Sequence, residues 1–213
     1  MRFRDRTDAG RQLAARLAAY AQHDDVIVLA LPRGGVPVAF EVARVLGAPL
    51  DVFLVRKLGV PGHPELAMGA IASGGVRVLS DDLVRQLGIP MHAVEETTTR
   101  EQAELERRDH LYRGTRPRPA LEHRTVILID DGLATGATME AAIRAARASN
   151  PARIVVAAPV GARETCERLA GIADEVVCAA TPEPFQAVGL WYEEFDQTSD
   201  DEVIDLLHKA AAA

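Results

Sequence analysis

The fold of this chain is decided by residues 126–138, which read VILIDDGLATGAT. The first four residues are aliphatic, and such an uninterrupted run is typical of a strand buried on both faces inside a parallel sheet. Two acids end the run, small and hydroxyl residues follow, and apolar residues then recur at helical spacing from Met139 to Ala146. A helix is therefore expected to begin near Thr138. This strand, turn and helix N-terminus predict an anion site, because free backbone N–H groups and the positive end of the helix dipole converge there.

The position of the acids separates this stretch from other phosphate-binding motifs. A Rossmann fingerprint has G-x-G-x-x-G with its ribose-binding acid about 20 residues later, and a Walker loop has Gly-Lys-Ser/Thr. Here Asp130 and Asp131 come before the loop, and the loop contains no lysine. The pattern suits a ribose whose hydroxyls meet the two aspartates while its 5′-phosphate lies in residues 134–138. The competing interpretation is a structural strand–helix turn with a solvated pair of aspartates.

Residues 126–138 resemble the motif with which type I phosphoribosyltransferases bind 5-phosphoribosyl 1-pyrophosphate (PRPP). The resemblance covers about residues 26–180. It implies an α/β fold, doubly wound, with a mostly parallel sheet and helices on both faces. It also implies a single domain over residues 1–213, with a flexible loop and hairpin at about 56–80 and a small hood or tail from about 181. Gly132-Leu133-Ala134 stand where many family members have a β-branched residue and a threonine, which leaves the acceptor open.

A second strand–turn–helix unit comes earlier in the chain. Residues 26–31 read as a buried strand, Pro32-Arg33-Gly34-Gly35-Val36-Pro37 as a turn, and residues 38–46 as a helix that Gly47 ends. Arg33 is suited to clasping pyrophosphate through its planar fork of donors. In the resembled family this position holds the pyrophosphate loop, which Arg33, Gly34 and Gly35 match. The alternative is a tight turn with an exposed arginine.

The next strand, residues 51–55, ends in Arg56 and Lys57. Residues 58–65 are rich in glycine and proline and are expected to form no regular element. Residues 67–72 and 76–79 are expected to pair as a hairpin. The resemblance implies a mobile basic loop that closes over the substrate, with Arg56 and Lys57 at its base and residues 58–65 as one candidate for the moving part. The alternative is that both cations are ordinary surface charges.

The remaining segments alternate in the same way. Residues 92–112 predict a highly charged helix with a narrow apolar seam, which either packs on the domain or meets a second subunit in a homodimer. Strands at 154–158 and 175–178 complete a parallel sheet with right-handed crossovers. Residues 181–197 carry most of the large aromatic side chains, either as a hood over the acceptor or as a packing core. A capping box of Ser199 and Glu202 opens the last helix.

Composition excludes several classes of function. The formal charge of −7 disfavours non-specific binding to nucleic acid or anionic membranes, and no apolar run reaches membrane-spanning length. Residues 1–5 lack the apolar core of a signal peptide. The two cysteines, Cys166 and Cys178, have no metal or redox spacing, so neither is expected to be reactive and a reducing cytoplasm is expected.

The resemblance implies transfer of a phosphoribosyl group from PRPP to a nitrogenous acceptor, expected to be a nucleobase, with release of pyrophosphate. Mg²⁺ is the expected cofactor, held through PRPP with Asp130 and Asp131 as candidate ligands. The implied catalytic residues are Asp130, Asp131, Arg33 and Lys57, the implied 5′-phosphate site is Ala134, Thr135, Gly136, Ala137 and Thr138, and the implied pyrophosphate site is Arg33, Gly34, Gly35, Arg56 and Lys57.

Two other functions compete with this one. A PRPP-binding regulator of the same fold would bind without turnover. A basic face would favour a regulator that binds nucleic acid, and this acidic chain shows none. An aspartyl phosphotransferase would need a D-x-D arrangement, which the adjacent acids do not provide.

Overall fold

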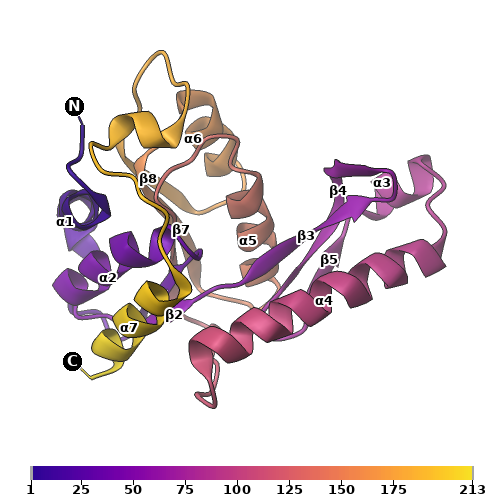
Figure 1. Cartoon of the computed structure of the whole chain (residues 1–213), viewed down its shortest axis with the longest axis horizontal. Helices are drawn as coiled ribbons and strands as arrows, with labels where there is room; N and C mark the ends of the chain where they lie inside the picture. The colour runs from indigo at the N-terminus through magenta and orange to yellow at the C-terminus, as the bar shows by residue number, and fades with distance from the viewer. Residues whose placement is uncertain (1, 213) are drawn as a thin grey trace.

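The computed structural model describes residues 2–212 and consists of a parallel sheet between helices and an arm that extends from it (Figure 1). The strands are β1 Val26–Ala30, β2 Leu50–Val52, β3 Val55–Val60, β4 His63–Ala72, β5 Val76–Leu79, β6 Thr125–Ile129, β7 Arg153–Val160 and β8 Glu175–Ala180. The helices are α1 Arg6–Arg16, α2 Gly35–Leu46, α3 Asp81–Gln86, α4 Met91–Arg113, α5 Ala137–Arg147, α6 Arg163–Ala170 and α7 Asp200–Ala211, with short 3-10 turns η1 Ala18–Tyr20 and η2 Val188–Trp191.

The main sheet has five strands in the order β2-β1-β6-β7-β8, and every pairing in it is parallel. The predicted α/β fold with a mostly parallel sheet is confirmed. From β1 the chain crosses to β2 on one side, and it later enters β6 on the other side. The winding direction therefore reverses between β1 and β6, and ligands in such sheets bind outside the carboxyl ends of the strands at this switch point.

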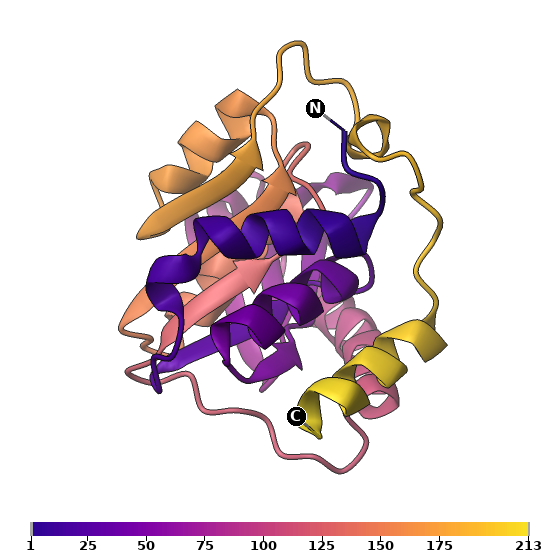
Figure 2. The same cartoon turned by 90° about the vertical axis from the view of Figure 1, so that its left-hand side faces the viewer.

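Alternate residues of the central strands supply the two faces of the sheet. Val26, Val28 and Ala30 of β1 pack with residues of α1, α2 and α7, whereas Ile27 and Leu29 pack with residues of α5 and α6. Figure 2 shows α1 and α2 lying across the first face. All five residues of β1 and of β6 are buried. Since burial of a large aliphatic side chain contributes about 1.5–3 kcal/mol to stability, these strands firmly hold the loops that follow them.

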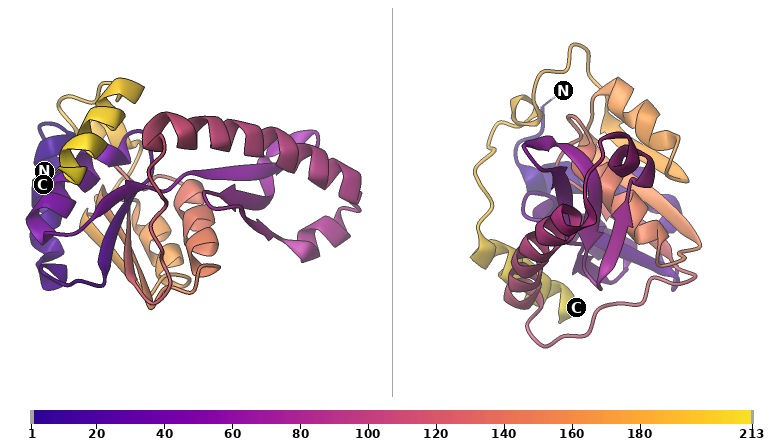
Figure 3. Two further views of the ribbon diagram at one scale, coloured as in Figure 1. Left: turned by 90° about the horizontal axis from the view of Figure 1, so that it is seen from below. Right: turned by 90° about the vertical axis from the view of Figure 1, so that its right-hand side faces the viewer.

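Strands β3, β4 and β5 form a separate antiparallel sheet, which extends away from the main sheet alongside α4 (Figure 3). The predicted hairpin of residues 67–72 with 76–79 is confirmed, because β4 pairs with β5 across a turn at Ser73–Gly75. The prediction that residues 58–65 form no regular element is wrong. They are the end of β3, a tight turn at 61–62 and the start of β4.

The glycines and proline of this segment are accommodated at its irregular positions. The β3–β4 register shifts on both sides of Gly59, as at a β-bulge, and Gly62 takes the left-handed conformation in the turn (φ 80°). Leu58 and Val60 are buried and hold the strand in place. Local composition indicated a loop, but the burial of these alternate side chains stabilises a strand.

Helix α4 runs along the arm, and its apolar seam is covered within the chain. Val94, Leu105 and Tyr112 are buried in the same core cluster as residues of β3 and β4. Of the two alternatives for this seam, packing on the chain's own sheet is observed. None of the helices within residues 2–212 combines the length and the apolar composition that crossing a membrane requires.

Candidate functional site

Two loops meet at the switch point of the sheet, one from β1 and one from β6. A Cβ added to Gly34 would lie 2.0 Å from Asp131 Oδ2, and one added to Gly35 would lie 2.6 Å from the carbonyl oxygen of Ile129. Only glycine permits this close approach at either position. The structure thus brings the predicted pyrophosphate loop and the predicted aspartate pair together.

Asp131 is paired with an arginine that the sequence analysis did not select. Arg6 Nη2 and Nε lie 2.8 Å and 2.9 Å from Asp131 Oδ2, and the two side chains are only 13% and 16% exposed. The Arg6 guanidinium also lies 4.0 Å above the centre of the Phe195 ring and donates a hydrogen bond to the carbonyl oxygen of Asp196. One local signal could have drawn attention to Arg6. A cation in the first turn of a helix opposes the helix dipole and needs another partner.

Each aspartate keeps one oxygen free for a ligand. Both nitrogens of Arg6 contact Asp131 Oδ2, and Asp130 Oδ1 accepts a hydrogen bond from the Asp131 N–H at 2.9 Å. Among the described residues, the only buried side-chain nitrogen or oxygen without a partner is Trp191 Nε1. The other oxygens, Asp130 Oδ2 and Asp131 Oδ1, accept no hydrogen bond from the described residues.

Burial disfavours two full charges on the aspartate pair. Desolvation raises the pKa of Asp130 well above its usual range, and the charge of Asp131 raises it further. Desolvation also raises the pKa of Asp131, while the positive charge of Arg6 acts in the opposite direction. The pair is therefore biased toward a single negative charge, held by Asp131 beside Arg6, with Asp130 as the carboxyl that more readily retains a proton.

Residues 134–138 form the loop that leads into α5, and we refer to them as the phosphate loop after the role that the sequence predicts for them. Helix α5 begins at Ala137, close to the predicted start near Thr138, after Gly136 in the left-handed conformation (φ 68°). Two side chains of α6 hold the carbonyl oxygens of this loop. Thr165 Oγ1 donates to the oxygen of Ala134 at 2.6 Å, and Arg168 donates to the oxygen of Thr135.

These contacts orient the loop's N–H groups. In a trans peptide the C=O and N–H bonds point in opposite directions. With the carbonyls of Ala134 and Thr135 turned toward α6, the N–H groups of Thr135 and Gly136 point away from it. The first N–H groups of α5 have no partner within the helix either. The result is a cluster of donors at a helix N-terminus, as the sequence predicted, but the contribution of Thr165 and Arg168 was not foreseen because they lie on another helix.

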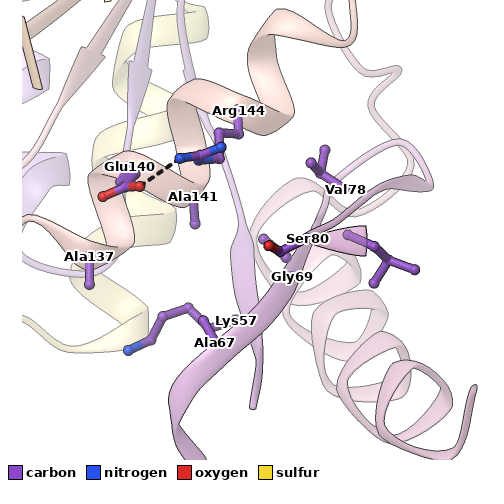
Figure 4. Close-up of a pocket in the computed structure, with 11 residues that line it drawn as sticks. Lys57, Ala67, Gly69, Val78, Ser80, Ala137, Glu140, Ala141 and Arg144 are labelled. Atoms are coloured by element: carbon purple, nitrogen blue, oxygen red, sulfur yellow. Dashed lines mark hydrogen bonds and ion pairs between the residues drawn. The ribbon is translucent and has the colours of Figure 1, made fainter. Parts of the chain in front are cut away.

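The three predicted cations differ in their partners. Arg33 Nη1 is 3.8 Å from Asp200 Oδ1, and Arg56 forms an ion pair with Glu101 at 2.6 Å. Lys57 pairs with no carboxylate among the described side chains. It lines a cavity of about 730 Å³ together with Arg56 and Thr138. Lys57 also lines a second cavity of about 350 Å³, where its side chain extends from β3 toward Ala137 at the start of α5 (Figure 4).

The aromatic tail packs onto the aspartates. Tyr192 is buried and donates a hydrogen bond from its hydroxyl to the carbonyl oxygen of Asp131 at 2.6 Å, with the Phe3 and Phe195 rings beside it. Packing is therefore the main role of Tyr192, whereas Phe195 is partly exposed beside Arg6. The tail also explains the departure at Gly132, because a Cβ there would lie 2.4 Å from Val188 Cγ1. A β-branched residue has no room at this position.

A parallel sheet with a phosphate loop and two carboxylates at its switch point is the arrangement of a phosphoribosyltransferase fold. The family model described as "Phosphoribosyl transferase domain" matches residues 4–190. The chain belongs to this family.

Individual relatives agree with this assignment. A protein of Mycobacterium tuberculosis (strain H37Rv), provisionally named a phosphoribosyl transferase, is 54% identical over 208 residues, which are 98% of this chain and 47% of the relative. The chain thus spans about half the length of this relative. The crystal structure of TT1426 from Thermus thermophilus is similar with a TM-score of 0.90 and 46% identity, covering 98% of this chain and 99% of that one. The structure of AQ2163 from Aquifex aeolicus has a TM-score of 0.52 at 13% identity, covering 86% and 78%, and shares the fold.

Proposed function

We propose that this protein transfers the 5-phosphoribosyl group of PRPP to a nitrogenous acceptor, with a nucleobase as the expected class, and releases pyrophosphate. The observation that carries the proposal is the meeting of the phosphate loop and the aspartate pair at the switch point of the sheet. Membership of the phosphoribosyl transferase family supports it independently. The free thiols of Cys166 and Cys178 suit a reducing cytoplasm, where we place the reaction.

The phosphate loop would bind the 5′-phosphate. The N–H groups of Thr135 and Gly136 are directed away from α6, and Ala137 and Thr138 add N–H groups of the α5 N-terminus, of which that of Ala137 makes only a long hydrogen bond, 3.5 Å, to Thr135 Oγ1. The ribose hydroxyls would then lie at Asp130 and Asp131, which come immediately before the loop. Asp131 Oδ1 accepts from one hydroxyl while Arg6 continues to occupy Oδ2.

Pyrophosphate would lie between the β1 loop and the base of the arm. Gly34 and Gly35 let the β1 loop pack against Asp131 and Ile129, and Arg33, Arg56 and Lys57 supply positive charge for the pyrophosphate. Arg33 and Arg56 must share their charge with Asp200 and Glu101, so Lys57 is the cation most directly available. Positive charge at this position stabilises the leaving group while the ribose carbon passes through an oxocarbenium-like transition state.

The residues present fit Mg²⁺, which usually binds one or two carboxylates and takes its other ligands from substrate oxygens and water. Asp130 Oδ2 and Asp131 Oδ1 are hard oxygen donors that accept no hydrogen bond from the described residues, and no cluster of three or more His, Cys, Asp or Glu side chains competes with them there. When bound, the ion would neutralise charge on pyrophosphate. Asp130 and Asp131 would then hold the ion and the ribose in a fixed position relative to each other.

The test is the double substitution Asp130→Asn with Asp131→Asn. The variant should lose PRPP-dependent pyrophosphate release in the presence of Mg²⁺ and a panel of purines, pyrimidines and small amines. Asp81→Asn with Asp82→Asn is the matched control, because it neutralises another adjacent aspartate pair at the start of a helix in the arm and should leave release unchanged. Equal release by the wild type and the Asp130/Asp131 variant would contradict the proposal.

The second candidate is a PRPP-binding regulator without turnover. The internal pairing of Arg6 with Asp131, Arg33 with Asp200 and Arg56 with Glu101 favours it, since a ligand must compete for these charges. Calorimetric binding of PRPP without pyrophosphate release for any acceptor in the panel would support this candidate. Release with one acceptor would exclude it.

A further inference from the structure

The two cysteines of the chain, which are separated by eleven residues in sequence, lie side by side in the fold. Cys166 is on α6 and Cys178 is on β8, and the crossover between them brings their Sγ atoms to 2.8 Å. A disulfide has an S–S length of about 2.05 Å, so the two sulfurs need to approach by only about 0.8 Å to bond. The expectation that neither thiol is reactive was based on sequence spacing and did not include this contact.

The surroundings leave room for both sulfurs and give access to them. A Cβ added to Gly161 would lie 2.6 Å from Cys166 Sγ and 3.1 Å from Cys178 Sγ, so a glycine here makes the space that the thiols occupy. Both cysteines are partly exposed. This partial exposure suits attack by an oxidant as small as hydrogen peroxide.

The contact also gives the two thiols different roles. The hydrogen bond between the two thiols lowers the pKa of Cys166, while the same bond and desolvation raise the pKa of Cys178. Cys166 is therefore the better thiolate and the expected nucleophile, and Cys178 is the resolving thiol.

Helix α6 connects this pair to the phosphate loop. Cys166 lies between Thr165 and Arg168, the two side chains that hold the carbonyl oxygens of Ala134 and Thr135. A Cβ at Gly136 would lie 2.6 Å from Thr165 Cγ2, so this part of α6 packs directly against the loop. A covalent bond from Cys166 to β8 restrains the helix that supports the loop.

We propose that Cys166 and Cys178 are a redox-active dithiol, a modification site for hydroperoxides, and that its disulfide form restrains the phosphate loop through α6. The Cys166 thiolate attacks the distal oxygen of the hydroperoxide. The O–O bond breaks, and the leaving oxygen takes a proton to give water or an alcohol. Cys166 becomes a sulfenic acid. The sulfur of Cys178 then attacks the Cys166 sulfur, the S–O bond breaks and water leaves. The two thiols lose two electrons and two protons, and the hydroperoxide is reduced.

The first experiment asks whether this disulfide forms. The protein is treated with hydrogen peroxide, remaining thiols are blocked with N-ethylmaleimide, and trypsin separates the cysteines into peptides 164–168 and 169–209. Mass spectrometry should find these two peptides joined in the monomer, and dithiothreitol should separate them. Cys166→Ser and Cys178→Ser are the controls and should show no such linkage. Oxidation of each cysteine only to sulfinic or sulfonic acid, or linkage only between molecules, would overturn the proposal.

The second experiment asks whether the loop responds. Hydrogen exchange in peptides that cover residues 133–138 and α6 should slow by about twofold or more on oxidation, because a cross-link reduces local opening. It should return to the initial rate with dithiothreitol and stay constant in Cys166→Ser. A disulfide that forms without changing exchange in residues 133–138 would overturn the link to the loop. Neither readout requires PRPP, so both stand apart from the proposed function.

Discussion

Replacing Arg6 with alanine tests the electrostatic account of the aspartate pair. The substitution removes both contacts to Asp131 Oδ2 and the stacking on Phe195, and it leaves a carboxyl that is only 16% exposed without its partner. Breaking a buried ion pair from one side costs about 3–5 kcal/mol. Because this pair retains some exposure, we expect a loss near the lower end, about 3 kcal/mol at pH 8. For a chain of this size that corresponds to a fall in Tm of roughly 6–12 °C.

The loss should depend on pH. Desolvation raises the pKa of Asp131 above its usual value of 3.8, and Arg6 opposes that rise, so the variant's pKa is higher still. A carboxyl with a raised pKa binds its proton more tightly in the folded state, so stability falls as pH rises through that pKa. The difference between the variant and the wild type should therefore be smallest at the acidic end of the range, where protonation of Asp131 weakens its pairing with Arg6 in the wild type and relieves the unpaired charge in the variant. The difference should grow steadily toward pH 8.

The assay is chemical denaturation of the wild type and Arg6→Ala from pH 4 to pH 8. Arg85→Ala is the matched control, because its ion pair with Asp82 is fully at the surface and should be worth less than about 1 kcal/mol at any pH. Arg6→Ala with Asp131→Ala should recover part of the loss, since no orphaned charge remains. A pH-independent loss, or none at pH 8, would refute the reasoning.

Three further predictions concern the loop and the tail. Gly132→Ala should destabilise the protein by about 1–3 kcal/mol in thermal denaturation, because its Cβ meets Val188, and Val188→Ala should rescue it. A Gly132→Ala variant as stable as the wild type would be inconsistent with that packing. Thr165→Val should lower the free energy of unfolding by about 1–3 kcal/mol, because it leaves the Ala134 carbonyl without its donor, and it should weaken PRPP binding in calorimetry. Unchanged affinity would argue against α6 as the support of the loop. Tyr192→Phe should cost about 1 kcal/mol in urea titration through loss of the hydrogen bond to Asp131, and a gain in stability would speak against it.

Much of the fold was predictable because local pattern and tertiary burial agree. The aliphatic runs of β1 and β6 are long enough to identify buried strands, and the cap residue Ser199 accepts the expected hydrogen bond from the Glu202 N–H. Residues 58–65 show the limit of this reasoning. Their glycines and proline indicated a loop, but contacts with α4 and β4, which local sequence does not contain, make them strands.

The site was predictable where its residues are close in sequence. Asp130, Asp131 and the phosphate loop are consecutive, so one motif revealed them. Arg6 could not be predicted in this way, since it lies 125 positions before Asp131 in the sequence. Thr165 and the contact between Cys166 and Cys178 were not foreseen for the same reason, because each partner lies on another element of the fold. Which distant residues pair in this way depends on the strand order, so such pairs can be identified only when the strand order is known.

The most direct test of the central claim is a crystal structure of the protein with PRPP and Mg²⁺. We predict that the 5′-phosphate accepts hydrogen bonds from the N–H groups of Thr135 and Gly136, with the ribose hydroxyls at Asp130 and Asp131. Density for PRPP elsewhere on the protein, with the phosphate loop empty, would contradict the account.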